Sequence, residues 1–238
     1  MVFARIRKGG KWEDVHPKVY SGGKWVDAHT RVRVNGQWVD LEKPKESKPD
    51  KPAYVPQVHV GTWWATWSEG YWGRHQNFVS HAHYNSKVNR NYPVQGNYVP
   101  SHDSFLGWDG IEGGMIGFDD GNIRSTLKGA KINKIEIYLV SYHWYNWSGG
   151  TAVIGTHNTR GWTDRFQESN HGVAHQRYTS RVQGQWITLP NWVGDNFRDN
   201  LLSGITVYAD NASKDQYGYF AGSLSGGDAP RLRITYTK

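Results

Sequence analysis

A short motif occurs three times near the N-terminus at a fixed spacing. In each copy a Gly-Gly or Asn-Gly pair precedes a Lys or Gln and then a tryptophan, and Trp12, Trp25 and Trp38 stand 13 residues apart. Gly-Gly and Asn-Gly pairs readily adopt the positive φ angles that two-residue hairpin turns require. The repeat therefore predicts three short β-hairpins over residues 1–41, a segment called the arm below.

The arm is too small to stabilise itself by burial. Small repeat units need stacked neighbours or other chains to form a core. We therefore expect residues 1–41 to dock onto another protein or to assemble with copies of the same chain, and we expect a homo-oligomer, with a trimer favoured. The three tryptophans are predicted to be structural anchors of the hairpins. A role as ligand slots is the alternative.

A charged, proline-containing segment follows the arm. Residues 43–52 place prolines among lysines and acidic residues. Proline at this spacing blocks helices and sheet ladders, and the charges keep the segment solvated and extended. We predict a linker over residues 42–57 that separates the arm from a second unit, residues 58–238.

The second unit has the pattern of many short strands separated by turns. Residues 130–145 carry apolar side chains on both phases of a strand, which predicts a central strand buried on both faces. Only residues 191–202 have a weak helical spacing. The predicted fold is all-β, a hairpin arm followed by a jelly-roll-like β-sandwich. Further strands are predicted at residues 58–67, 151–157, 185–189, 204–209, 217–221 and 232–237.

Composition and charge exclude several classes of protein. The chain has 238 residues, no cysteine and a formal net charge of +7. The lack of cysteine excludes disulfides, zinc-thiolate sites and a cysteine nucleophile. Residues 1–52 carry 12 Lys and Arg against 7 Asp and Glu, and because the two signs alternate we expect no nucleic-acid partner. The sequence has no apolar run of about 18 residues, so membrane insertion is not expected. The first eight residues lack the apolar region of a signal peptide.

Several strings of the second unit, in their order, resemble the C-terminal β-domain of minor tail and tail-fibre proteins of siphophages that infect Gram-positive bacteria. The Gly-Lys-Trp-Val-Asp repeats of the arm are similar to modules in such tail proteins. This resemblance covers residues 1–41 and 110–238, and it marks no catalytic residue. The strings are Ile116-Gly117-Phe118, residues 127–132, His143-Trp144-Tyr145, residues 149–158, residues 186–190, Phe197-Arg198-Asp199, Gly204-Ile205 and residues 231–236.

The resemblance implies a receptor-binding component of the virion tail, extracellular when it acts. Its arm would contact other virion proteins. Its sandwich would bind a polysaccharide of the host cell wall or cell surface.

Two aromatic clusters are the strongest candidates for ligand contact. Sugar rings pack their C–H faces on aromatic rings, and their hydroxyls need polar groups nearby. A strand end that leads into loops is a common binding surface. The alternative is that the tryptophans replace aliphatic residues in the core, since a strand places Trp63 and Trp67 on one face and Trp64 on the other. The candidate ligand-binding residues are His143, Trp144, Tyr145, Asn146, Trp147, Trp63, Trp64 and Trp67.

Two polar motifs raise the question of a bound metal. His81 and His83, with His102 or Asp103, could bind a divalent transition metal, but solvated loop histidines are the favoured interpretation. Residues 119–122, Asp-Asp-Gly-Asn, resemble part of a calcium loop. They lack the spaced acidic residues and the terminal glutamate of an EF-hand, so a hairpin turn is favoured. We predict no metal and no cofactor.

Catalysis is a minority interpretation. A glycosidase needs two carboxylates about 5–9.5 Å apart, and Glu69, Glu112, Asp119, Asp164 and Glu168 are scattered along the chain. The sequence has no Gly-x-Ser-x-Gly nucleophile motif. We therefore expect no enzyme. A glycan-binding tail component is favoured, and a structural decoration or connector protein without ligand and a polysaccharide depolymerase remain as alternatives.

Overall fold

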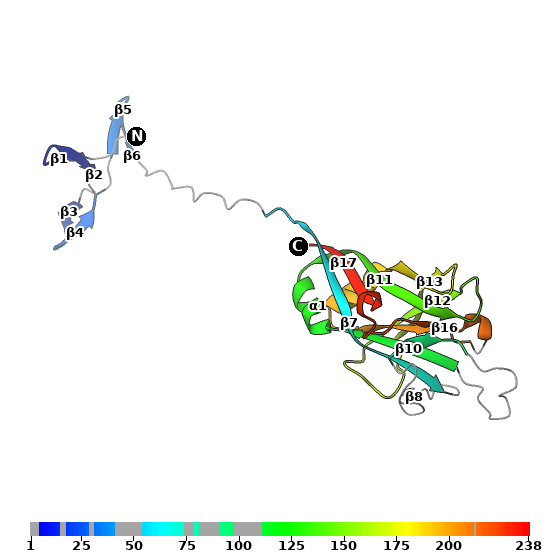
Figure 1. Ribbon diagram of the computed structural model, residues 1–238. Helices are drawn as coiled ribbons and strands as arrows, with labels where there is room; N and C mark the ends of the chain where they lie inside the picture. The colour runs from blue at the N-terminus through cyan, green and yellow to red at the C-terminus, as the bar shows by residue number, and fades with distance from the viewer. Residues whose placement is uncertain are drawn as a thin grey trace. The chain divides into compact units, whose positions relative to one another are not determined.

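The computed structural model divides the chain into two compact units, Met1–Tyr54 and Val55–Lys238 (Figure 1). The boundary falls inside the segment 42–57 that was predicted as a linker. Among the residues that the structure describes, no helix is long and apolar enough to cross a membrane. The described residues are 5–14, 18–28, 31–40, 54–73, 79–80, 91–97, 111–211 and 213–238.

The first unit contains the three predicted hairpins, and that prediction is confirmed. Each tryptophan lies directly across from a long side chain of the partner strand: Arg7, Tyr20 or Arg33. The turn residues have the positive φ angles expected from their sequence. None of the described side chains in the arm is buried, and Trp12, Trp25 and Trp38 are 64–66% exposed. The strands are β1 (Arg5–Lys8), β2 (Lys11–Asp14), β3 (Lys18–Ser21), β4 (Lys24–Asp27), β5 (Arg31–Val34) and β6 (Gln37–Asp40).

The second unit is built on an 11-stranded antiparallel sheet. Its main path runs β13-β12-β15-β10-β7-β17-β11-β16-β9, with β14 beside β11 and β8 beside β7. Its strands are β7 (Val58–Gly73), β8 (Val79–Ser80), β9 (Val94–Gln95), β10 (Ile111–Phe118), β11 (Lys131–Trp144), β12 (Thr151–His157), β13 (Asn170–Arg177), β14 (Gln183–Leu189), β15 (Gly204–Tyr208), β16 (Gly218–Phe220) and β17 (Arg231–Thr237).

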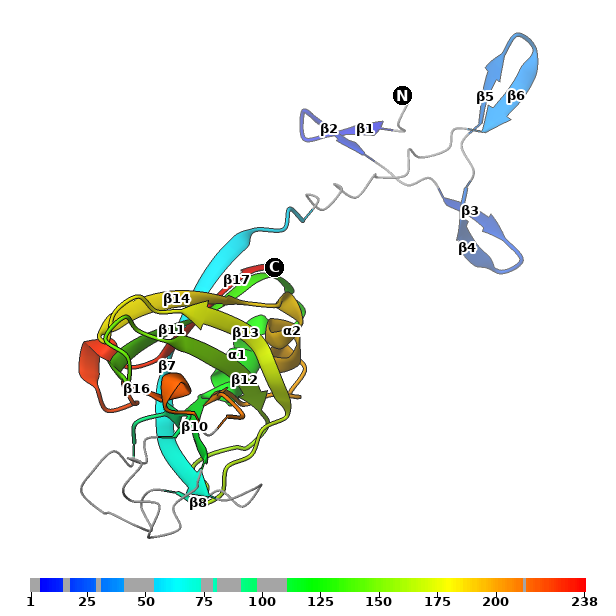
Figure 2. The same cartoon turned by 90° about the vertical axis from the view of Figure 1, so that its right-hand side faces the viewer.

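The long strand β7 joins two halves of this sheet. Its first part pairs with β17 and its second part pairs with β10. The two halves face each other over one apolar core, to which β11 and β17 contribute from one side and β10, β12 and β15 from the other. Figure 2 shows the two layers edge-on. The all-β sandwich is therefore confirmed, and β11 is buried on both faces along its middle, as predicted.

Two short helices, α1 (Asp120–Leu127) and α2 (Asn191–Arg198), pack against one end of the core. The hairpin turn predicted for residues 119–122 is wrong. Asp119 is the N-cap of α1, and its Oδ1 accepts a hydrogen bond from the Asn122 amide at 2.9 Å. A carboxylate in this position satisfies an orphan amide of the first helical turn.

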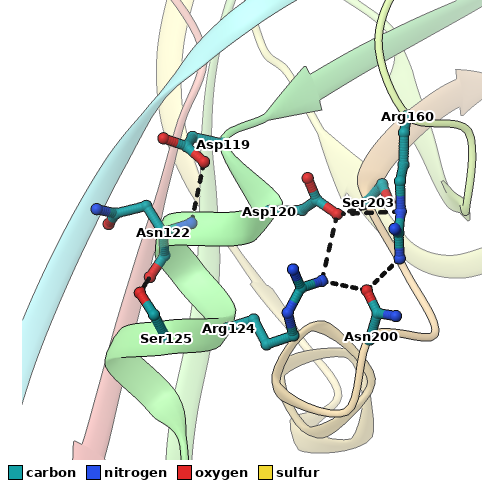
Figure 3. A network of polar contacts seen from close by, with 8 residues as sticks. All are labelled: Asp119, Asp120, Asn122, Arg124, Ser125, Arg160, Asn200 and Ser203. Carbon is teal, nitrogen blue, oxygen red and sulfur yellow. Dashed lines mark hydrogen bonds and ion pairs between the residues drawn. The ribbon is translucent and has the colours of Figure 1, made fainter.

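A polar network ties α1 to two neighbouring loops (Figure 3). Asp120 forms ion pairs with Arg160 at 3.4 Å and with Arg124 at 3.9 Å, and it accepts a hydrogen bond from the Ser203 hydroxyl at 3.3 Å. Both guanidinium groups also donate to the side-chain oxygen of Asn200. All of these hydrogen bonds and ion pairs join residues of the second unit. The network therefore connects α1 to its neighbouring loops.

Candidate ligand-binding surface

An irregularity in β11 decides which aromatic residues near its end reach solvent. The pairing of β11 with β16 shifts register between Ser141 and His143. Such a bulge inserts one residue and reverses the inward–outward alternation beyond it. As a result Tyr142 and His143 both lie on the partly exposed side, and Trp144 turns into the core.

Trp144 is therefore not a ligand contact, and its prediction as a binding residue is corrected. The side chain is completely buried. Its ring packs against those of Tyr178 and Phe220, with centroids 5.6 and 5.5 Å away. Gly150 and Gly218 lie against the same ring so closely that a β-carbon at either position would clash with it. Trp144 has no surface left to offer a ligand.

The residues after Trp144 form an exposed cationic and aromatic patch, which we call the rim surface: Tyr145, Trp147, Arg181 and Lys214. Trp147 is 79% exposed. The guanidinium carbon of Arg181 lies 4.0 Å from its ring centroid, and the Lys214 ammonium lies 5.7 Å from the Tyr145 ring. Within the described part of the chain, no carboxylate lies at ion-pair distance from Arg181 or Lys214. Both cations are partly exposed, and neither charge is neutralised by a described carboxylate.

The loop that carries the rim surface is held in place by hydrogen bonds. Arg181 donates to the Tyr145 carbonyl at 3.0 Å. The Asn146 side chain donates a hydrogen bond to Asp215 at 3.2 Å. The main-chain carbonyl of Asn146 accepts a hydrogen bond from the Gly149 amide at 3.0 Å. Asn146, predicted as a polar ligand contact, thus has an anchoring partner. A surface fixed in this way loses little conformational entropy when it binds.

His143 belongs to a stack of rings beside the rim surface. Its ring is stacked on Tyr219 with centroids 5.5 Å apart, and Tyr219 is stacked on Tyr92 at 5.9 Å. Tyr142 meets Tyr92 edge-on. Burial and, secondarily, the charge of Arg181 lower the pKa of His143, which favours the uncharged imidazole. The stack is a row of partly exposed rings along β11 and β16, beside the rim surface.

The tryptophans of β7 do not form one site. Trp63 packs against the core and donates from Nε1 to Asn122 at 2.7 Å. Trp67 lies under the second half-sheet, beside His157 and Gly117. Trp64 points outward on the other phase. The expected alternation is confirmed for Trp63 and Trp64 and is wrong for Trp67. The register between β7 and β10 shifts between Gly117 and Phe118, so Trp67 packs on the face of Met115 and Tyr71, whereas Trp63 packs on the main core. Both Trp63 and Trp67 are largely packing residues.

Trp64 belongs to a row of four neighbouring side chains on the outside of the sheet, which the sequence alone does not indicate. Register places Trp64, Arg231, Tyr138 and Trp186 directly opposite one another on β7, β17, β11 and β14. The Arg231 guanidinium lies 4.0 Å from the Tyr138 ring centroid and 4.6 Å from that of Trp64. Because the arginine already occupies the space between these rings, the row offers a ligand less free aromatic face than Trp147 does.

The remaining candidates are carboxylates considered for catalysis and side chains considered as metal ligands. Some of them have partners within the fold, and the others lie outside the described residues. Glu69 accepts from Trp162 Nε1 at 2.8 Å, and Glu168 pairs with His171 at 2.9 Å and accepts from Thr206. Among the described residues no cluster of three or more potential ligands could hold a metal ion. His81, His83, His102 and Asp103 lie outside the described residues.

Comparison with known proteins adds no relative. The chain matches no model of a protein family and no curated protein.

Proposed function

We propose that this chain is a structural component of a bacteriophage tail, a minor tail, tail-fibre or baseplate protein, that binds a host cell-surface glycan through its sandwich. The observation that carries the proposal is the stacked pair of Trp147 and Arg181 on an anchored loop. The face of Trp147 opposite the guanidinium can take a sugar ring, and the Lys214 ammonium beside Tyr145 can donate to sugar oxygens. The ordered strings that resemble tail proteins support the same proposal.

The arm has a separate role in this proposal. Its tryptophans and several valines are exposed, and none of the side chains that the structure describes in this segment is buried. Exposed apolar surface of this kind marks an interaction site. We propose that residues 1–41 attach the protein to other virion proteins and hold several copies together, with a trimer favoured.

The test measures binding of the fluorescently labelled full-length chain to intact Gram-positive cells and to purified wall polysaccharide, with free sugars as competitors. We expect saturable, sugar-competed binding. Trp147→Ala should weaken it about tenfold, which corresponds to about 1.4 kcal/mol, the order of magnitude of one aromatic ring contact. Trp192→Ala is the matched control, since Trp192 is an exposed tryptophan on α2.

Two outcomes would count against this function. Equal binding by wild type and Trp147→Ala would remove the rim surface as the site. No binding by any folded sample would favour the structural alternative, a decoration or connector protein without ligand. The exposed arm is the observation that favours that alternative, since it needs protein contacts and no glycan.

A depolymerase would need a free pair of carboxylates. Glu69, Asp119 and Glu168 each hold an internal hydrogen bond. Release of reducing ends from wall polysaccharide by the purified chain would nevertheless establish this alternative.

A further inference from the structure

One edge of the sandwich sheet is open along the start of β7. Residues Val58–Trp64 pair with β17 on one side. On the other side, β10 begins to pair only at Ala65. In the part of the chain that the structure describes, no strand lies along the free side of the first seven residues of β7.

The hydrogen-bond phase identifies which residues face the open edge. Gln57 and Lys238 exchange two main-chain hydrogen bonds of 2.9 Å, which makes them a hydrogen-bonded pair. In an antiparallel ladder such pairs alternate with pairs that point their main-chain groups away. Val58, Val60 and Thr62 therefore direct their N–H and C=O groups toward the open edge. The Ala65 amide donates a hydrogen bond to the Pro230 carbonyl at 2.8 Å, on the side of β17. This is the direction that the alternation predicts for an odd-numbered residue of β7.

This edge lacks the features that protect edge strands in monomeric proteins. Such strands usually carry lysine, proline or a bulge that prevents pairing with another chain. Residues 58–64, Val-His-Val-Gly-Thr-Trp-Trp, contain no proline and no Lys, Arg, Asp or Glu, and their register with β17 is regular. Val58 is 66% and Val60 is 61% exposed. An open, uncharged and apolar edge is a template for β-pairing.

We propose that this edge pairs with the same edge of a second copy, antiparallel, about a two-fold axis at Val60. This contact is separate from the contacts of the arm, and it joins chains that belong to different arm-linked trimers. The arrangement places Val60 opposite its own counterpart and Val58 opposite Thr62. All three residues that face the edge then obtain main-chain partners, and the exposed valines of the two copies cover one another. The uncharged stretch lets two copies approach without like-charge repulsion. A symmetric contact of this type uses the same patch on both chains.

Cysteine cross-linking tests the pairing and its register in the full-length chain. The natural chain has no cysteine, so each single substitution gives one thiol. Residues directly opposite in such a ladder have Cα atoms about 5.5 Å apart, within the range that a disulfide spans. Val60→Cys should form a disulfide-linked dimer under mild oxidation. Thr62→Cys alone should not, because it faces Val58, but a mixture of Val58→Cys and Thr62→Cys chains should.

Thr62→Pro supplies an independent test. The Thr62 amide faces the open edge, so proline removes an edge donor and leaves the β17 ladder complete. We expect this variant to keep the thermal transition of the wild type and, when combined with Val60→Cys, to lose the cross-link. Exposed Ser125→Cys on α1 controls for random collision. Cross-linking of Thr62→Cys alone, equal cross-linking of Ser125→Cys and Val60→Cys, or no cross-link in any variant would overturn the proposal.

Discussion

The guanidinium of Arg181 lies over the ring of Trp147 at 4.0 Å and also donates to the carbonyl of Tyr145. One side chain thus orients the exposed tryptophan and fixes the loop that carries it. Such a contact at an exposed site contributes about 0.5–1 kcal/mol. The arginine therefore matters more for the orientation of the rim surface than for the stability of the fold.

Arg181→Ala should separate these two effects. We expect the free energy of unfolding to fall by about 1–2 kcal/mol, since the variant loses the ring contact and one hydrogen bond, and we expect polysaccharide binding to fall about fivefold or more. Urea denaturation and the cell-binding assay measure the two quantities. Lys131→Ala removes an exposed cation at the other end of β11 and is the control. Equal binding by the two variants would show that the rim cation has no role.

Trp144→Ala should destabilise the protein without a direct effect on the ligand surface. Removal of a fully buried tryptophan costs about 3–5 kcal/mol, since the packed neighbours Tyr178 and Phe220 cannot fill the space. Trp147→Ala should lower the free energy of unfolding by no more than about 1 kcal/mol, the contribution of its contact with Arg181. Urea denaturation of the two variants gives the comparison. Similar losses in both would mean that the β11 bulge does not place Trp144 as described.

Trp144 is buried and Trp147 is exposed, a difference that the sequence does not predict. Alternation correctly predicted the faces of Trp63 and Trp64, because that part of β7 is regular. It could not predict the bulge after Ser141, since nothing in the local sequence marks the extra residue. The inward turn of Trp144 depends on the pairing with β16, a strand about 75 residues further along the chain, which is a long-range contact that periodicity does not encode.

Glycine explains the missed strand β10. Gly113 and Gly117 lack the side chains that a strand pattern requires, yet each is needed where a ring presses on the backbone, Phe166 at the first and Trp67 at the second. The hairpins were predictable because their turns are local. Arg181 and Lys214 were not, since only the fold brings them beside Trp147 and Tyr145.

His157 should make the protein less stable in acid. Burial lowers the pKa of His157 to about 4, and its Nε2 lies 3.0 Å from the Ile116 carbonyl, to which the neutral ring donates. The unfolded chain takes up a proton below about pH 6.5, and the folded chain does so only near pH 4. The stability is therefore full above pH 6.5 and falls by about 3 kcal/mol as the pH decreases to about 4.

The measurement is the free energy of unfolding at several pH values between 4 and 7, for wild type and His157→Gln. Glutamine keeps a donor for the carbonyl but does not titrate, so the variant should show a shallower slope over this window. Parallel slopes would assign the acid sensitivity to other groups.

Glu112 should have the opposite effect on the pH dependence of stability, so that the protein becomes less stable as the pH rises. It lies on β10 opposite Trp72, on the phase shared with the core residue Ile116. Burial raises the pKa of its carboxyl to about 8, whereas the unfolded chain ionises near 4.5. The stability from this group is present below pH 4.5 and is lost as the pH rises through about 8, because ionisation then favours the unfolded chain.

Glu112→Gln tests this sign, since the amide is an uncharged mimic of the protonated acid. Between pH 6 and 8 the wild type should lose stability steadily and the variant should lose less, so that their difference grows with pH and levels off above about pH 8. Thermal denaturation across this range measures the effect, with Glu13→Gln in the exposed arm as the control. A wild-type stability that stays constant from pH 6 to 9 would show that Glu112 is ionised in the folded protein.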